Sequence, residues 1–342
     1  MMKREWTRNL LCFLLFLVLF NLSTVSTFNI SAYPLEHADT FDGAMRSDYR
    51  DTISAEKPEI IVLGDSSISH LSDEMIAGMT GKSTRVFSMP GTGSAYWYLF
   101  IRNQLFLADH RPDYFILFFR DSMLTVPEYR VKGEYFIRLE EIATVWDEDV
   151  YDLAINYKKP ATLKFLERYV PIISYRNEIY SQWIQWSRNF LPELMMGVNK
   201  AEVDSSFEKV FGRQQINAQL WEEYQLNIDS LLYTATALDF SDNLRESFLP
   251  AILRELNMMG IQPVFVRVKY RSHALGEKDD PALLEYLADL EAYLQNAGAK
   301  YVDLTAAAEL SAEMYADNFH IQPQAEDQAT AVIVAEILKV LD

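Results

Sequence analysis

Residue types suited to nucleophilic serine chemistry occur in short segments far apart in this chain. Ser66 stands in a Gly-Asp-Ser sequence directly after an apolar run, and Asp317 precedes His320 by three residues near the C-terminus. A nucleophilic serine needs a base that takes its proton, a carboxylate that orients this base, and N–H donors for the oxyanion. The chain contains candidates for these groups, so it could transfer or hydrolyse acyl groups through an acyl-serine.

The Gly-Asp-Ser sequence also has a purely structural interpretation. Asp and Ser are favoured at helix starts, where their side chains accept hydrogen bonds from free backbone N–H groups. Asp65 or Ser66 could therefore only cap the helix that the amphipathic pattern Leu71–Met79 predicts. If Ser66 is a nucleophile, the same N–H groups and the helix dipole would stabilise negative charge beside it.

Apolar runs between helical patterns predict a parallel sheet in an α/β fold. Helical patterns occur at Arg245–Met259, Pro281–Asn296 and Gln324–Leu341. The predicted strands are Glu59–Leu63, Thr84–Ser88, Pro112–Phe119, Pro263–Val268 and Lys300–Leu304.

Candidate residues for the active site follow most of these strands. Ser66 follows the first strand, Gly91 the second and Ser122 the third, while Asp317 and His320 follow the fifth. Ligands in open α/β sheets gather at the carboxyl edge of the strands, so we expect these residues to meet there.

The pattern of strands and helices is interrupted in the middle of the chain. Residues 126–244 have few strand-like runs and several helical patterns, which predicts a helical insertion. Residues 58–125 and 245–342 would then form one domain around it, and residues 31–57, which lack clear periodicity, predict a linker.

Residues 1–30 predict a cytoplasmic stub and a single-pass transmembrane anchor. Lys3, Arg4 and Arg8 precede a stretch without charge, and Leu10–Ile30 would be about 31 Å long as a helix. The preceding basic residues place the N-terminus in the cytoplasm and the rest of the chain in the periplasm or outside the cell. A cleaved signal peptide is the alternative, because the most apolar part, Leu10–Leu22, is short.

Composition narrows the classes of partner and cofactor. The 342 residues carry a net charge of −18 without a basic stripe, which argues against nucleic acid as the main partner. The one cysteine, Cys12, lies in the predicted membrane segment, so the rest of the chain has no thiol or disulfide chemistry. No set of Cys, His and carboxylate residues has metal-ligand spacing, and we expect no metal or other cofactor.

The chain resembles the SGNH (GDSL-like) hydrolase superfamily over roughly residues 58–125 and 245–342. Gly64-Asp65-Ser66 is similar to the first sequence block of this superfamily, Met89-Pro90-Gly91 to the second, and Asp317-x-x-His320 to the last. The resemblance implies a flavodoxin-like three-layer sandwich with about five parallel strands. It also implies that Ser66 is the nucleophile, that His320 is its base and that Asp317 orients His320. The N–H groups of Ser66 and Gly91 would hold the oxyanion.

The third block departs from the family pattern. Where the family has Gly-x-Asn-Asp, this chain has Arg120-Asp121-Ser122-Met123. The missing asparagine would donate to the oxyanion, and the loss of one such donor can cost about 10²–10³ in rate. Ser122 or the Arg120 side chain could replace it.

Further polar residues lie near the expected site. Arg120 and Arg267 are candidates for binding an anionic substrate group, and so is Lys269, which lies with Arg267 at the end of the fourth strand. A solvated strand end is the alternative for both Arg267 and Lys269. His70 lies one helical turn after Ser66 and could approach the site, but we expect it on a polar helix surface.

A membrane-tethered domain of this kind resembles the accessory proteins that work beside membrane-bound O-acyltransferases. This resemblance implies O-acetylation of an exopolysaccharide or cell-wall glycan through an acyl-serine, with a membrane-bound O-acyltransferase and the polysaccharide as partners. Esterase activity would use the same intermediate. The alternative is a catalytically inactive SGNH fold that binds polysaccharide or scaffolds a membrane acylation complex.

Overall fold

The computed structural model describes residues 40–157, 159–170 and 228–341, with a few single positions elsewhere. The chain forms two compact units, one of residues 1–39 and 158–225 and one of residues 40–157 and 226–342. We call the second unit the sheet domain. All the candidate site residues named above lie in it.

Five parallel strands form the centre of the sheet domain, in the order β2-β1-β3-β4-β5. This confirms the predicted parallel α/β sheet. The strands are β1 (Ile60–Gly64), β2 (Thr84–Ser88), β3 (Tyr114–Phe119), β4 (Gln262–Arg267) and β5 (Lys300–Asp303), each within two residues of its predicted bounds. The strand order reverses between β1 and β3, and this switch point is where doubly wound sheets bind ligands.

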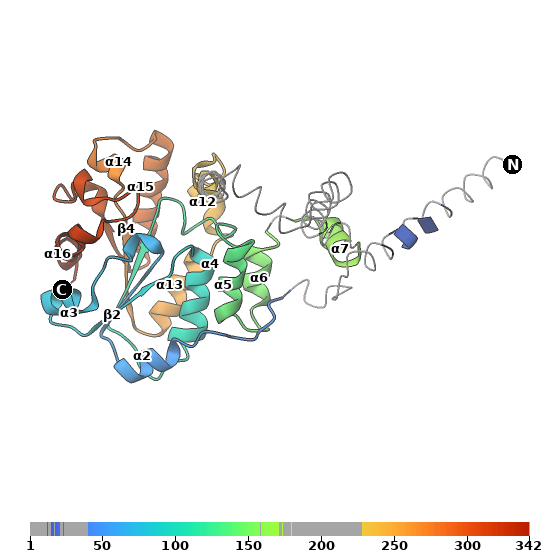
Figure 1. Cartoon of the computed structure of the whole chain (residues 1–342), viewed down its shortest axis with the longest axis horizontal. Coiled ribbons are helices and arrows are strands. Elements are labelled where there is room, and N and C mark those ends of the chain that lie inside the picture. Colours follow the sequence, from blue (N-terminus) through green and yellow to red (C-terminus); the bar gives the residue numbers. More distant parts are fainter. Residues whose placement is uncertain are drawn as a thin grey trace, which may run out of the picture. The chain divides into compact units, whose positions relative to one another are not determined.

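Side chains alternate between the two faces of the sheet, as the strand period of two requires. In β1, Ile61 and Leu63 enter one hydrophobic cluster, and Ile60 and Val62 enter another. Helices α4, α13 and α15 cover the first face, and α3 and α16 pack side by side on the second (Figure 1). The sheet is therefore the middle layer of three.

The described helices have well-defined bounds. They are α2 (Arg50–Glu56), α3 (Asp73–Thr80), α4 (Ser94–Phe100), α5 (Glu134–Ile142), α6 (Glu148–Ala154), α7 (Ala161–Tyr169), α12 (Phe240–Leu244), α13 (Leu249–Met258), α14 (Arg271–Ala274), α15 (Pro281–Asn296) and α16 (Glu326–Leu338). Helix α15 has its predicted bounds, because the Asp280 side chain caps its start and Pro281 occupies its first position.

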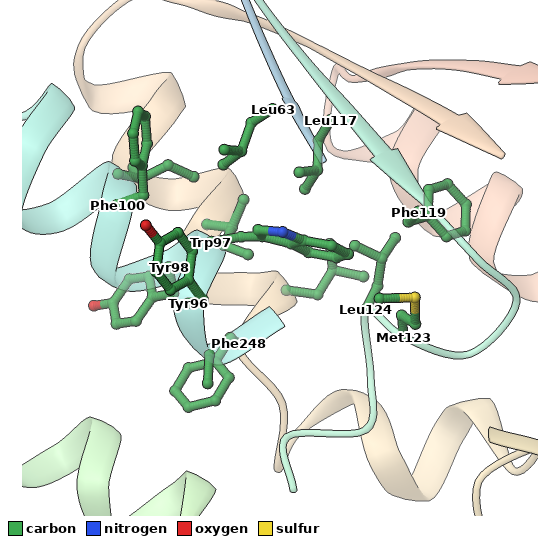
Figure 2. Packing of buried hydrophobic residues seen from close by; sticks show 14 of the residues in the cluster. Leu63, Tyr96, Trp97, Tyr98, Phe100, Leu117, Phe119, Met123, Leu124 and Phe248 are labelled. Carbon is green, nitrogen blue, oxygen red and sulfur yellow. The ribbon is translucent and has the colours of Figure 1, made fainter. Parts of the chain in front are cut away.

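Trp97 of α4 lies at the centre of the larger cluster and is fully buried. Figure 2 shows its ring packed among Leu63, Leu117 and Leu124, so α4 is fixed against β1, β3 and the segment after β3. This helix follows the turn that contains Gly91. The packing of Trp97 therefore positions one of the candidate site segments.

Parts of the predicted linker and insertion pack on this same core. Phe41 and Ile53, from the predicted linker, are fully buried in it. Helices α5, α6 and α12 and the 3₁₀ helix η3 (Ser230–Tyr233), from the predicted insertion, also contribute buried residues. Helix α7 belongs to the other unit.

Most of the predicted membrane segment Leu10–Ile30 lies outside the described residues. No helix within the described part of the chain combines the length and the apolar character needed to cross a membrane.

Candidate active site

Ser66, His320 and Asp317 form a continuous hydrogen-bonded chain beyond the carboxyl ends of the strands. His320 Nε2 lies 2.9 Å from Ser66 Oγ, and His320 Nδ1 lies 2.7 Å from Asp317 Oδ2. The His320 side chain keeps 39% of its surface exposed, so a substrate can reach the Ser66–His320 pair. This arrangement lets the imidazole take the serine proton while the carboxylate holds the imidazole in one orientation.

The Asp-x-x-His spacing builds a tight loop around the Asp317 carboxylate. Asp317 Oδ1 accepts hydrogen bonds from the backbone N–H groups of Phe319 and His320 at 2.7 and 2.8 Å. Partial burial raises the pKa of Asp317, but these donors and the His320 ring outweigh it, and the pKa lies below its usual range. Asp317 is therefore ionised at neutral pH and can stabilise a protonated His320.

The turn after β1 differs from the predicted strand-to-helix junction. Ser66–Ile68 is a single 3₁₀ turn, capped by the Asp65 side chain, which accepts from Ser67 N at 2.9 Å. Helix α3 begins only at Asp73, because Ser72 provides its N-cap. The helix dipole acts mainly within the first turn, so α3 does not support Ser66 as we expected.

Gly91 adopts a conformation that only glycine fits well. Its φ is +77°, and a Cβ atom at this position would lie 2.7 Å from Tyr135 Cε1. Thr92 Oγ1 donates to Met89 O at 2.7 Å and accepts from Trp97 Nε1 at 3.2 Å, which stabilises the turn.

This turn is joined directly to the segment that carries Ser66. Met89 N donates to Gly64 O at 2.9 Å, so the second block lies beside the end of β1. The N–H groups of Ser66 and Gly91 make no hydrogen bond with other described residues. Both therefore remain candidate donors to an oxyanion.

The third block does not offer the donors that we expected. Ser122 is fully buried, and its Oγ donates to Leu232 O at 2.6 Å, so this proton is not available to an oxyanion. Arg120 keeps only 3% of its surface exposed and contacts Asp65, Asp229 and Tyr129. Arg120 therefore does not line a surface that a substrate could reach.

Arg267 is likewise buried rather than placed to bind substrate. Its side chain is 1% exposed and contacts Asp121, Asp279 and Asp303 at 3.0, 2.8 and 3.3 Å. Burial opposes the charge, but these carboxylates raise the pKa of Arg267 above its usual value. Nearby, Lys269 is also buried, and its Nζ donates to Ala307 O at 2.6 Å. Neither residue forms a solvated strand end.

Asp121 is a structural residue that the sequence patterns did not single out. It is fully buried, has a φ of +42° and accepts hydrogen bonds from Tyr233 and Tyr270, each at 2.5 Å, besides pairing with Arg267. A carboxylate directly after a buried strand was the available signal. Asp121 ties the end of β3 to β4 and to η3.

His70 lies inside the protein and not on a polar helix surface. Burial lowers its pKa to about 4, His320 acts in the same direction, and the Ser67 backbone opposes the shift only in part. Together with Lys269 and Phe319, His70 lines a small cavity of about 20 Å³. That space is large enough for a water molecule.

A scan against protein-family models and a search of the curated proteins both found no match for this chain. The described residues also contain no group of three or more His, Cys, Asp or Glu side chains placed to hold a metal ion. The function is therefore inferred from the geometry of the candidate site.

Proposed function

We propose that this protein is an exported, membrane-anchored SGNH-type serine acyltransferase that O-acetylates an exopolysaccharide or a cell-wall glycan. The observation that carries the proposal is the continuous hydrogen-bonded chain from Ser66 through His320 to Asp317. Two further observations support the proposal. The strand order is that of flavodoxin-like folds, and Ser66, His320 and Asp317 lie at the carboxyl edge of the sheet.

The reaction proceeds in two steps through an acetyl-serine. Ser66 Oγ first attacks the acetyl carbonyl of the donor, and its proton passes to His320 Nε2. The tetrahedral intermediate then expels the leaving group of the donor, which takes this proton. In the second step His320 removes the proton of a sugar hydroxyl, whose oxygen attacks the acetyl-serine. Collapse of this intermediate releases the acetylated sugar and returns the proton to Ser66.

The oxyanion in both steps is held by the backbone N–H groups of Ser66 and Gly91. The Ser122 hydroxyl already donates to Leu232 O and adds no third donor. A missing donor slows acyl transfer by about 10²–10³. A bound glycan can offset this loss by holding its hydroxyl in place, whereas water cannot, so we favour transfer over hydrolysis.

The proposal also covers location and partners. The domain acts outside the cytoplasm, tethered by Leu10–Ile30, and receives acyl groups through a membrane-bound O-acyltransferase. The basic residues before an uncharged apolar stretch support this orientation.

Mass spectrometry after incubation with an activated acetyl ester tests the proposed nucleophile. We expect one acetyl group on the peptide that carries Ser66 and none there in Ser66→Ala. Ser69→Ala is the matched control, because Ser69 is exposed three residues further along the same turn. An adduct of equal yield in Ser66→Ala would contradict the proposal.

Transfer and hydrolysis are separated by following acetate and acetylated oligosaccharide together from one donor. Transfer predicts that an added glycan becomes acetylated while acetate release falls. Acetate release that no offered glycan changes, with no acetylated sugar formed, would favour an esterase.

A polysaccharide-binding protein or scaffold without catalytic activity is the second candidate. The Ser122 and Arg120 side chains favour it, because both are buried and donate to other parts of the protein. A scaffold would keep its cellular role when Ser66 is replaced by Ala. Loss of that role in a normally expressed Ser66→Ala variant would argue against the scaffold.

A further inference from the structure

The guanidinium of Arg120 contacts three separate segments around the candidate site. Its Nε lies 3.3 Å from Asp65 Oδ2, its Nη1 lies 3.3 Å from Asp229 Oδ2, and its Cζ lies 4.8 Å from the ring centroid of Phe319. Asp65 immediately precedes Ser66, and Phe319 immediately precedes His320. One buried cation therefore joins the neighbours of the nucleophile and of its base.

The charged contacts of this cluster are shielded from water, because Arg120 and Asp65 are both buried. Burial raises the pKa of Asp65, but the charges of Arg120 and Arg130 outweigh it and hold the pKa below its usual range. Burial also opposes the charge on Arg120, yet the surrounding groups raise its pKa well above the usual value. Both partners are charged at neutral pH, and their attraction is screened less than at the surface.

Asp229 is the second carboxylate that contacts Arg120. Tyr129 Oη donates to Asp229 Oδ1 at 2.5 Å and accepts from Arg120 Nη2 at 2.5 Å. Arg130 lies 3.5 Å from both Asp65 Oδ2 and Asp229 Oδ1. The cluster thus contains two arginines and two aspartates, and each arginine contacts both aspartates.

Asp229 is held in place independently of Arg120. It directly precedes η3, where Leu232 O accepts from Ser122 Oγ at 2.6 Å and Tyr233 Oη donates to Asp121 Oδ2 at 2.5 Å. The segment by which the chain re-enters the sheet domain is therefore fixed to the end of β3. It offers a firm anchor for the Arg120 side chain.

We propose that Arg120 is a positioning residue for the Ser66–His320 pair and that Asp229 sets the orientation of its guanidinium. This inference rests on the proposed role of Ser66 as nucleophile. Without the Asp229 carboxylate, Arg120 shifts from Phe319, and the loop that carries His320 is held less firmly. A small displacement of a reacting group can cost about 10²-fold in rate.

The proposal is tested by the rate at which a fluorophosphonate ester labels Ser66. This rate is measured from about pH 5 to about pH 9, across the usual titration range of histidine. The variants are Asp229→Asn and Arg120→Lys. The lysine keeps the positive charge at position 120 but lacks the planar guanidinium group. The control is Asp149→Asn, because the Arg102–Asp149 ion pair (2.8 Å) shares no residue with the cluster. Labelling is measured below the melting temperature of every variant.

We expect a fall of about 10-fold or more in the limiting labelling rate for Asp229→Asn and Arg120→Lys. The ester concentration at half-maximal rate should stay unchanged, and Asp149→Asn should match the wild type. A loss of rate no greater than the unfolded fraction of each variant would overturn the proposal, because it would reveal a purely structural role.

Amide hydrogen exchange gives a second measurement that does not depend on reactivity. The N–H groups of Phe319 and His320, which donate to Asp317, should exchange about 10-fold faster in Asp229→Asn, while those of β4 stay unchanged. Wild-type protein that is not labelled would contradict the proposed function alone. Unchanged exchange at Phe319 and His320 would contradict the positioning role, whatever the labelling result.

Discussion

His70 stands four residues after Ser66, the proposed nucleophile, but takes no part in the hydrogen-bonded chain of the site. Its ring is buried beside Lys269 and a cavity that has room for a water molecule. Burial lowers the pKa of His70 to about 4, so the folded protein keeps this ring neutral at pH values where a free histidine is protonated. The stability of the fold must therefore depend on pH through this residue.

Replacing His70 with Phe should remove part of the acid sensitivity of the fold. As pH falls from about 6.5 to about 4, the unfolded chain takes up a proton that folded His70 refuses, so wild-type stability should fall by about 3 kcal/mol. Above this window both states are neutral and nothing changes. Denaturant unfolding at several pH values measures the difference, which should be absent in His70→Phe.

Asp65 and Asp317 do not change the stability of the fold between about pH 6.5 and about pH 4. The pKa values of Asp65 and Asp317 lie below their usual range, so their contribution to stability is lost only below about pH 4. Equal pH dependence of stability in the wild type and in His70→Phe would show that His70 is solvated.

The strands and the loop that carries Asp317 and His320 could be predicted from the sequence, because residues close together in the chain determine them. Continuous apolar runs marked the strands, and the Asp-x-x-His spacing places Asp317 within reach of His320 because three residues close a single turn. The partners of Ser122 and Arg267 could not be predicted, since Leu232 and Asp303 lie far away in the sequence. Such contacts arise only when the sheet is assembled.

Gly91→Ala should disable the second block without unfolding the domain. The backbone at Gly91 has positive φ, and an added Cβ would clash with Tyr135, so the turn must move. We expect the rate of Ser66 acylation to fall by about 10²–10³, as for the loss of an oxyanion donor.

Gly298→Ala is the matched control for this prediction. Gly298 has nearly the same φ, +79°, but an added Cβ would have no neighbour within 4 Å. This variant should lose about 1 kcal/mol of stability and keep wild-type acylation. Acylation by Gly91→Ala at the wild-type rate would show that the Gly91 N–H does not contact the oxyanion.

At the scale of the whole molecule, every candidate catalytic residue belongs to the sheet domain. This domain consists of residues 40–157 and 226–342, and residues 158–225 belong to the other unit. The two functions that the proposal requires, formation of the acetyl-serine and capture of a glycan, can therefore be tested apart.

Replacement of residues 158–225 by a flexible Gly/Ser linker should leave acylation of Ser66 within a few-fold of the wild-type rate. If the replaced residues help to bind the acceptor, acetylated oligosaccharide should no longer form while acetate release continues. Unchanged transfer to the glycan would place the acceptor site wholly within the sheet domain. Circular dichroism and the exchange rates of β4 amides verify that the domain is folded.

Ser66 and His320 are separated by 254 positions in the sequence, and the last helix, α16, packs on α3. During synthesis Ser66, the proposed nucleophile, is therefore made long before His320, its proposed base. The Ser66–His320 contact cannot form before the C-terminal residues exist, so a nascent chain carries Ser66 without this partner. On the proposed function, reactivity would begin only when the C-terminal residues have been made and have docked. A cell that secretes the chain unfolded would thus keep the serine inert until it reaches the compartment where folding finishes.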